Sequence, residues 1–275
     1  MSPHRASAPF TDDWKHFRFD IEDGVATVTF DRPERLNALT FESYADFRDL
    51  LAELPHRDDI GVLVVTGSGQ AFCAGGDRED IIGSLQEAGS KELLEFTRMT
   101  GAVVQRMREL PQPIVAAVNG VAAGAGAVIA LAADLRVLAR SATFAFLFSR
   151  VGLAGADMGS AYLLPRVVGL GRAAELLLLG EDISAERALD IGLATAVVED
   201  TELAQHTGMM ARRLVAGPSF AHAATKLLLA REQDMPLAGA LELEAVTQAL
   251  LMASDDHREF YRAFTEGRDP TWRGR

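Results

Sequence analysis

Three short apolar runs, the last of them interrupted only by Arg136, most constrain the fold of this chain. They occupy residues 62–65, 114–118 and 135–138. A continuous apolar run of this length is typical of a β-strand that is buried on both faces. Residues 25–30, which are compact and rich in β-branched side chains, predict a further strand. Residues 41–54 instead have apolar side chains at helical spacing, so the chain predicts repeated β-then-α units.

The chain changes character after Asp157, because most of the segments that follow have helical patterns. Glycines end several of these segments, as glycine commonly does after a helix. We expect an α/β core over residues 16–200, preceded by an N-terminal extension over residues 1–15 and followed by a helical region over residues 201–275. The expected helices are residues 175–180, 185–192, 203–216, 220–231 and 237–253, and the glycines are Gly180, Gly192 and Gly217.

Length and composition predict one large globular domain. The chain has 275 residues, of which 48% are hydrophobic, and this is enough for a sizeable core. The net charge is −12 and no long basic run occurs, which argues against nucleic acid as a partner. The six histidines show no metal-ligand spacing, so no metal is expected.

The single cysteine, Cys73, excludes an intramolecular disulfide and fits a cytoplasmic location. Its apolar neighbours predict a buried side chain without a chemical role. Residues 1–10 lack the apolar stretch of a secretory signal. The longest apolar run, residues 120–133, is shorter than the roughly 20 residues that a membrane helix needs. We therefore expect a soluble protein with no membrane partner.

Two glycine-rich turns, within residues 71–77 and 113–126, are the strongest candidates for chemistry. In each, an apolar strand runs into small residues that open a helix. Small residues let a ligand approach the backbone, and a helix start leaves N–H groups free. Two N–H groups aimed at one point form an oxyanion hole, which stabilises negative charge on a carbonyl oxygen. Tight packing is the alternative for either turn alone, and a dinucleotide site at Gly120, Gly124 and Gly126 is a weaker one.

Together with other segments, these turns resemble the enoyl-CoA hydratase/isomerase (crotonase) superfamily. The similarity spans about residues 16–267 and keeps the family's order of motifs. It implies an α/β fold with a crotonase-like ββα spiral core and a C-terminal helical trimerisation region. It also implies an acyl-CoA substrate, no cofactor beyond the coenzyme A moiety of that substrate, and a homo-trimer or dimer of trimers. The similar blocks are residues 31–39, 71–77, 113–126, 166–169 and 256–264.

The resemblance also implies roles for single residues. The backbone N–H groups of Gly76 and Ala125 would form the oxyanion hole. Arg35 would meet a phosphate of coenzyme A, and a solvated loop arginine is the alternative. The other contacts with the substrate and its coenzyme A would come from Ala38, Ala74 and Asp77 along the adenine and pantetheine, and from Gly124 and Phe148.

The chain departs from the family's hydratases at both catalytic glutamates. Val128 and Phe148 stand at those positions, and residues 144–148 predict an apolar aromatic wall. One carboxylate survives nearby, Asp157. Its spacing is similar to that of the catalytic aspartate of dienoyl-CoA isomerases and aryl-CoA dehalogenases, where it serves as a base or a nucleophile. The alternative for Asp157 is an N-cap, because it precedes an expected helix.

We predict an enzyme that acts on an enoyl-CoA thioester, with a bulky or aromatic acyl group, through an enolate held in the oxyanion hole. Asp157 replaces the two usual glutamates as the acid/base, because one carboxylate can both remove and return a proton. Hydration stays open if Asp157 positions water, alone or with Ser149 or Ser160. The alternatives are a non-catalytic acyl-CoA-binding relative, and an aryl-CoA dehalogenase or hydrolase with Asp157 as nucleophile.

Overall fold

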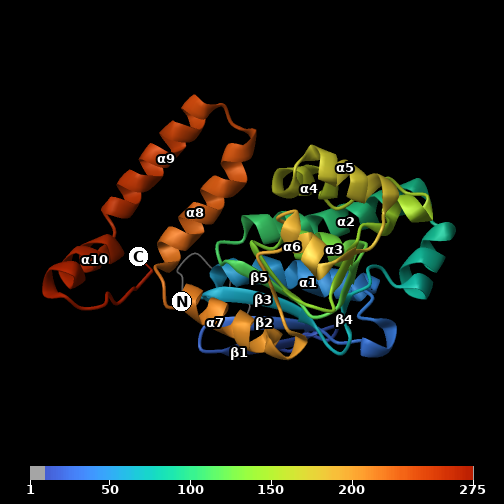
Figure 1. Ribbon diagram of the computed structural model, residues 1–275, viewed down its shortest axis with the longest axis horizontal. Coiled ribbons are helices and arrows are strands. Elements are labelled where there is room, and N and C mark those ends of the chain that lie inside the picture. Colours follow the sequence, from blue (N-terminus) through green and yellow to red (C-terminus); the bar gives the residue numbers. More distant parts are fainter. Residues whose placement is uncertain (1–9, 275) are drawn as a thin grey trace.

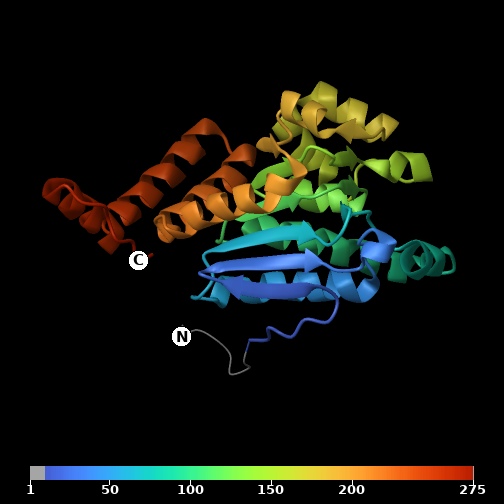
Figure 2. The same cartoon turned by 60° about the horizontal axis from the view of Figure 1, so that its bottom comes forward.

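A six-stranded sheet forms the centre of the fold. In the computed structural model, which describes residues 10–274, its strand order is β1-β2-β3-β5-β7-β10. Only β1 is antiparallel to its neighbour. Figure 2 shows the first strands, coloured blue to cyan, side by side. The strands are β1 (Arg18–Glu22), β2 (Val25–Phe30), β3 (Val62–Gly67), β5 (Ile114–Val118), β7 (Leu135–Ala139) and β10 (Ala196–Val198).

A second sheet has the strand order β4-β6-β8-β9. Its strands are β4 (Ala71–Cys73), β6 (Val121–Ala123), β8 (Thr143–Ala145) and β9 (Ile183–Ser184). Along the chain, β3, β5 and β7 of the first sheet are each followed by a strand of the second. The chain therefore winds through both sheets as a ββα spiral, which confirms the predicted α/β core.

Local signals in the sequence begin the helices. Thr40 opens α1 with a capping box, in which its side-chain oxygen accepts the N–H of Ser43 at 3.2 Å. Ser184 and Ser254 cap two later helices in the same manner. The helices are α1 (Phe41–Glu53), α2 (Ser90–Glu109), α3 (Ala125–Ala132), α4 (Ser160–Val168), α5 (Leu170–Leu179), α6 (Ala185–Asp190), α7 (Leu203–Val215), α8 (Ser219–Arg231), α9 (Leu237–Met252) and α10 (Asp255–Glu266).

The apolar runs predicted as buried strands lie in the core. No residue of β5 is more than 5% exposed, and β5 pairs in parallel with β3. Helix α7 falls within the helical region predicted from residue 201 onward. It nevertheless packs against the large sheet, where it contacts β2, β3, β5 and β7. The helices that leave the sheets therefore begin with α8 and not with α7.

Helices α8, α9 and α10 extend away from the two sheets, as Figures 1 and 2 show. Lys226 anchors α8, because its ammonium lies 2.8 Å from Asp134 and 3.0 Å from the carbonyl oxygen of Gln112. Among the described residues, no single helix is long and apolar enough to cross a membrane; α9 and α10 would pass together by length and composition, but they are bent by 63°. Large exposed apolar side chains on α9 and α10 include Leu237, Leu241, Val246, Leu250, Phe260 and Phe264.

Gly126 lets α3 pack directly on β4, because a Cβ atom there would lie 2.1 Å from the carbonyl oxygen of Cys73. We expect Gly126→Ala to lower the free energy of unfolding by about 1–3 kcal/mol, the usual cost of overpacking a core. Chemical denaturation measures the change. Gly101→Ala is the matched control, because Gly101 lies within α2 and an added Cβ meets nothing within 4 Å. That control should gain up to about 1 kcal/mol of stability, and equal stabilities of the two variants would contradict the close packing.

Candidate active site

The two glycine-rich turns meet backbone to backbone. The first turn follows β4 and the second follows β6, which is the parallel neighbour of β4. Gly75, in the first turn, has a φ of 96°. A Cβ atom on Gly75 would lie 3.0 Å from the carbonyl oxygen of Ala123 and 3.4 Å from the nitrogen of Ala125. Glycine is suited to this position because it accepts a positive φ and leaves room for the second turn.

Two backbone N–H groups at this contact have no acceptor. Within the described part of the chain, neither the N–H of Gly76 nor that of Ala125 donates a hydrogen bond. Ala125 is the first residue of α3, so its N–H has no partner inside the helix. The neighbouring N–H of Gly124 is satisfied, because it donates to Ala145 at 2.8 Å. Gly76, Gly124 and Ala125 all border one cavity, where two free N–H groups can stabilise an oxyanion.

The cavity has a volume of about 550 Å³ and is lined mainly by apolar side chains. Its walls come from the helical turn η3 (Arg78–Gly83), from α2, and from the segment between η5 (Leu147–Val151) and Met158. An apolar cavity of this size has room for a large acyl group. The apolar lining includes Ile81, Leu85, Phe96, Phe148, Leu153 and Met158.

Asp157 is the one acidic side chain among the described residues that lines this cavity. Its carboxylate accepts a hydrogen bond from the N–H of Met158 at 2.8 Å. Burial raises the pKa of Asp157, and the hydrogen bond from Met158 opposes this effect only in part. Helix α4 has Gly159 as its N-cap, without a side-chain cap, so Asp157 does not cap this helix. A half-buried carboxyl group with a raised pKa is suited to accept and return a proton.

The two positions expected to hold glutamate in a hydratase bring no charge to the cavity. Val128 is fully buried in α3, and Phe148 contributes an apolar ring to the cavity wall. Of the predicted aromatic wall at residues 144–148, only the last two side chains line the cavity, and the others pack in the core. Neither Ser149 nor Ser160 lines it. The Ser160 hydroxyl instead donates to a backbone carbonyl of its own loop at 2.8 Å.

Helices α1 and α2 contribute a wall of the cavity that was not predicted from the sequence. Tyr44 of α1 and Phe96 of α2 both line the cavity, and their rings meet edge to face with centroids 6.0 Å apart. The sequence did contain one indication of Tyr44, because this residue places a hydroxyl on the otherwise apolar face of the helix predicted at residues 41–54. For Phe96 no motif marks the position, because an apolar helix residue gives no indication of whether it faces a core or a cavity.

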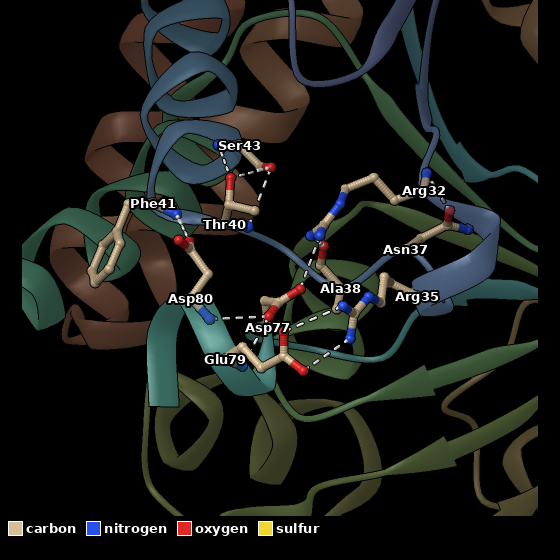
Figure 3. Close-up of polar contacts among 10 residues, drawn as sticks. All are labelled: Arg32, Arg35, Asn37, Ala38, Thr40, Phe41, Ser43, Asp77, Glu79 and Asp80. Carbon is tan, nitrogen blue, oxygen red and sulfur yellow. Dashed lines mark hydrogen bonds and ion pairs between the residues drawn. The ribbon is translucent and has the colours of Figure 1, made fainter. Parts of the chain in front are cut away.

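The other predicted coenzyme A contacts divide between the cavity and the loop before α1. Ala74 lines the cavity, whereas Arg35, Ala38 and Asp77 do not. Figure 3 shows these three residues grouped beside that loop. The Arg35 guanidinium is about half exposed and pairs with Glu79 at 3.3 Å, so it lies at the surface next to the first turn.

Asp77 holds the first turn in place. Its buried carboxylate accepts the N–H groups of Glu79 at 2.9 Å and of Asp80 at 3.1 Å, as Figure 3 shows. Arg32 forms an ion pair with Asp77 at 3.0 Å and also donates to the carbonyl oxygen of Ala38 at 2.7 Å. The hydrogen bond from Asp80 and the guanidinium of Arg32 lower the pKa of Asp77, although burial opposes them. The carboxylate thus ties η3 to the loop before α1.

The lowered pKa of Asp77 gives a pH-dependent stability. The ionised form stabilises the fold above the carboxyl pKa of the unfolded chain, about 4, and this contribution is lost as the pH falls toward the lower folded pKa. We expect Asp77→Asn to cost about 1–3 kcal/mol at pH 7, because Arg32 loses its charged partner, and less at pH 3. Denaturation at both pH values measures the difference. Asp58→Asn, at an exposed position, is the control, and an equal loss at pH 7 and pH 3 would contradict this role.

Cys73 is buried, as predicted. Burial raises the pKa of its thiol to about 12, which disfavours the thiolate at neutral pH. Its sulfur accepts a hydrogen bond from the N–H of Gly75 at 3.4 Å, so the side chain helps to hold the first turn in place. No group of three or more histidine, cysteine, aspartate or glutamate side chains that could hold a metal ion occurs among the described residues.

The chain is similar to known proteins over nearly its whole length. The sequence model of the family described as enoyl-CoA hydratase/isomerase matches residues 20–275. The 1,2-epoxyphenylacetyl-CoA isomerase of Escherichia coli (strain K12) is 39% identical over 93% of this chain and 97% of that protein. The (E)-benzylidenesuccinyl-CoA hydratase of Thauera aromatica is 34% identical over 93% and 98% of the two chains. A crystal structure from Streptomyces coelicolor A3(2), titled as a candidate enoyl-CoA hydratase, has a TM-score of 0.98 and 57% identity and covers 100% of both chains.

Proposed function

The chain belongs to the enoyl-CoA hydratase/isomerase family, whose enzymes act on CoA thioesters, and from this premise we propose that it moves a double bond in an enoyl-CoA ester. The observation that carries the proposal is the single carboxylate, Asp157, in an apolar cavity that also contains two free N–H groups. The isomerase from Escherichia coli and the hydratase from Thauera aromatica are both named for a CoA ester whose acyl group has an aromatic ring. These two names support a bulky or aromatic acyl group in the substrate, for which the cavity has room.

In the proposed reaction, the thioester carbonyl oxygen accepts hydrogen bonds from the N–H groups of Gly76 and Ala125. The ionised Asp157 removes a proton from a carbon next to the double bond. The freed electron pair moves toward the carbonyl oxygen, and the two N–H groups stabilise the resulting enolate. The protonated Asp157 then returns the proton to a different carbon, and the carbonyl re-forms. Atoms and charge balance, so one carboxylate is sufficient.

Hydration is the second candidate, because the relative from Thauera aromatica is named a hydratase. It requires a water molecule held beside Asp157. Ser149 and Ser160, the two serines that the sequence suggested could help to position this water, do not line the cavity. Proton transfer by Asp157 alone therefore fits the lining better. A reaction with Asp157 as the nucleophile differs in its products, so one product analysis separates all three reactions.

We propose that the coenzyme A portion lies across the first turn, outside the acyl cavity. Arg35 would supply positive charge for a phosphate in a protein whose net charge is −12. Its partner Glu79 is 75% exposed, and such surface pairs are separated at little cost. Ala38 and Ala74 have small side chains beside this path, and Asp77 holds the loop that carries Ala38. No cofactor beyond coenzyme A is proposed.

Mass spectrometry in deuterated water distinguishes the candidate reactions. The test uses a panel of 2-enoyl-, 3-enoyl- and aryl-substituted enoyl-CoA esters. Isomerisation gives a product of unchanged composition apart from exchanged deuterium, whereas hydration adds one solvent water. Release of a halide or a free acid would indicate Asp157 as a nucleophile. We expect the isomer, and a panel in which no ester changes would count against the proposal.

We expect Asp157→Asn to lower kcat by about 10²–10⁴-fold, because asparagine cannot accept the proton. Asparagine can still accept the N–H of Met158, so the fold and the binding of a saturated acyl-CoA should survive. Steady-state kinetics, thermal unfolding and calorimetric binding measure these quantities.

The control for this variant is Asp58→Asn, which is exposed and outside the cavity and should keep full activity. In the unaltered enzyme kcat/KM should fall in acid, because protonated Asp157 cannot act as a base. The raised pKa places this fall at a higher pH than for an ordinary aspartate. An active Asp157→Asn enzyme with an unchanged pH profile would remove Asp157 from the mechanism.

We propose that α8, α9 and α10 join copies of this chain into a homo-trimer or a dimer of trimers. Leu237 of α9 and Phe264 of α10 are 75% and 74% exposed. Exposed apolar side chains that are grouped on neighbouring helices commonly mark a protein–protein interface. Multi-angle light scattering should give three or six times the chain mass of 29.6 kDa. A monomer at micromolar concentration would rule this assembly out.

A further inference from the structure

Tyr44 places a hydroxyl group inside the acyl cavity. It is 2% exposed and lies on the face of α1 that packs toward α2. Its ring is held edge to face against Phe96, and both residues line the cavity. The side chain is thus fixed by packing, and its hydroxyl is the one group on it that can bind a ligand by hydrogen bonding.

The Tyr44 hydroxyl is unpaired, in contrast to the other neutral polar side chains of the cavity. Thr97 donates to the carbonyl of Leu94 at 3.2 Å, and Thr100 donates to that of Thr97 at 3.1 Å. The Gln86 amide donates to a carbonyl of its own turn at 3.4 Å. Among the described residues, no group forms a hydrogen bond with the Tyr44 hydroxyl. The hydroxyl is also not one of the unpaired polar atoms that are completely buried in the protein. Its hydroxyl therefore opens into the cavity.

Tyr44 and Asp157 line the same cavity. The negative charge of Asp157 acts on the Tyr44 hydroxyl. Burial raises the pKa of Tyr44 well above its ordinary value, and the negative charge of Asp157 adds to the effect. Tyr44 therefore stays protonated at neutral pH, where its hydroxyl can donate a hydrogen bond.

We propose that Tyr44 donates a hydrogen bond to an oxygen atom carried by the acyl group, close to the carbons on which Asp157 acts. The enzyme then selects acyl-CoA esters with a hydroxyl, epoxide or carbonyl oxygen near the thioester. The inference rests on the proposed function and adds the class of substrate to it. A purely hydrocarbon acyl group offers this donor no acceptor, so it gains no hydrogen bond from Tyr44.

Calorimetric binding to saturated esters tests the inference, because it needs no turnover. The ligands are 3-phenylpropanoyl-CoA and its 2-hydroxy and 3-hydroxy derivatives, and the proteins carry Asp157→Asn so that no ester reacts. We expect at least one hydroxylated ester to bind tenfold or more tightly than the hydrocarbon ester. The further substitution Tyr44→Phe should abolish this preference, because phenylalanine has no hydroxyl to donate. It should leave the affinity for the hydrocarbon ester within about twofold, because that ester makes no hydrogen bond with Tyr44.

Tyr162→Phe is the matched control, because Tyr162 bonds to Asp234 and does not line this cavity; it should keep the preference. Thermal unfolding checks that Tyr44→Phe folds, and phenylalanine retains the contact with Phe96. An equal loss of affinity for all three esters would show that Tyr44 only shapes the cavity, which overturns the inference. A preference that survives in Tyr44→Phe, or no preference at all, also overturns it. Failure of every ester to bind would overturn the proposed function itself, so the two failures are distinguishable.

Discussion

The close contact between two backbone turns is the constraint on which the site depends. β4 and β6 are parallel neighbours, so the turns that follow them leave the same edge of the small sheet. The contacts at Gly75 and Gly126 leave little or no room for a β-carbon, and this holds the first turn against the second turn and α3. The free N–H groups of Gly76 and Ala125 then reach one cavity. The proposed oxyanion hole is therefore a product of backbone packing and needs no polar side chain.

Buried and half-buried polar side chains around the site hold these turns without entering the cavity. The amides of Asn37 and Asn119 both donate to the carbonyl oxygen of Ala71, at 2.7 and 3.1 Å, and so fix the start of β4. Asp77 and Arg32 fix the other end of the same turn. Each of these groups is satisfied within the protein, as buried polar groups usually are. The cavity is thereby kept apolar, apart from the few groups left free to meet a ligand.

The apolar enclosure has two electrostatic consequences that support the same chemistry. Low polarisability strengthens the attraction of fixed N–H dipoles for a developing negative charge. The same enclosure disfavours the charge on Asp157 and raises its pKa, which makes this carboxyl a stronger base when it is ionised. A wall in which Phe148 stands where a hydratase would have glutamate therefore does more than remove a second acid. In the proposed mechanism, it supplies the environment in which a single aspartate moves a proton in both directions.

The sequence by itself determined the strands, most helices and the two glycine turns, because burial on both faces and helical spacing leave local patterns in residues such as 62–65 and 41–54. It also determined that Val128 and Phe148 bring no charge. Only the tertiary structure decided which side chains face the cavity. Asp157 and Tyr44 both line it, although their positions also suit a local role, as a cap or as a core residue. The reason is physical: a local pattern records whether a residue is buried, whereas facing a cavity depends on segments far apart along the chain.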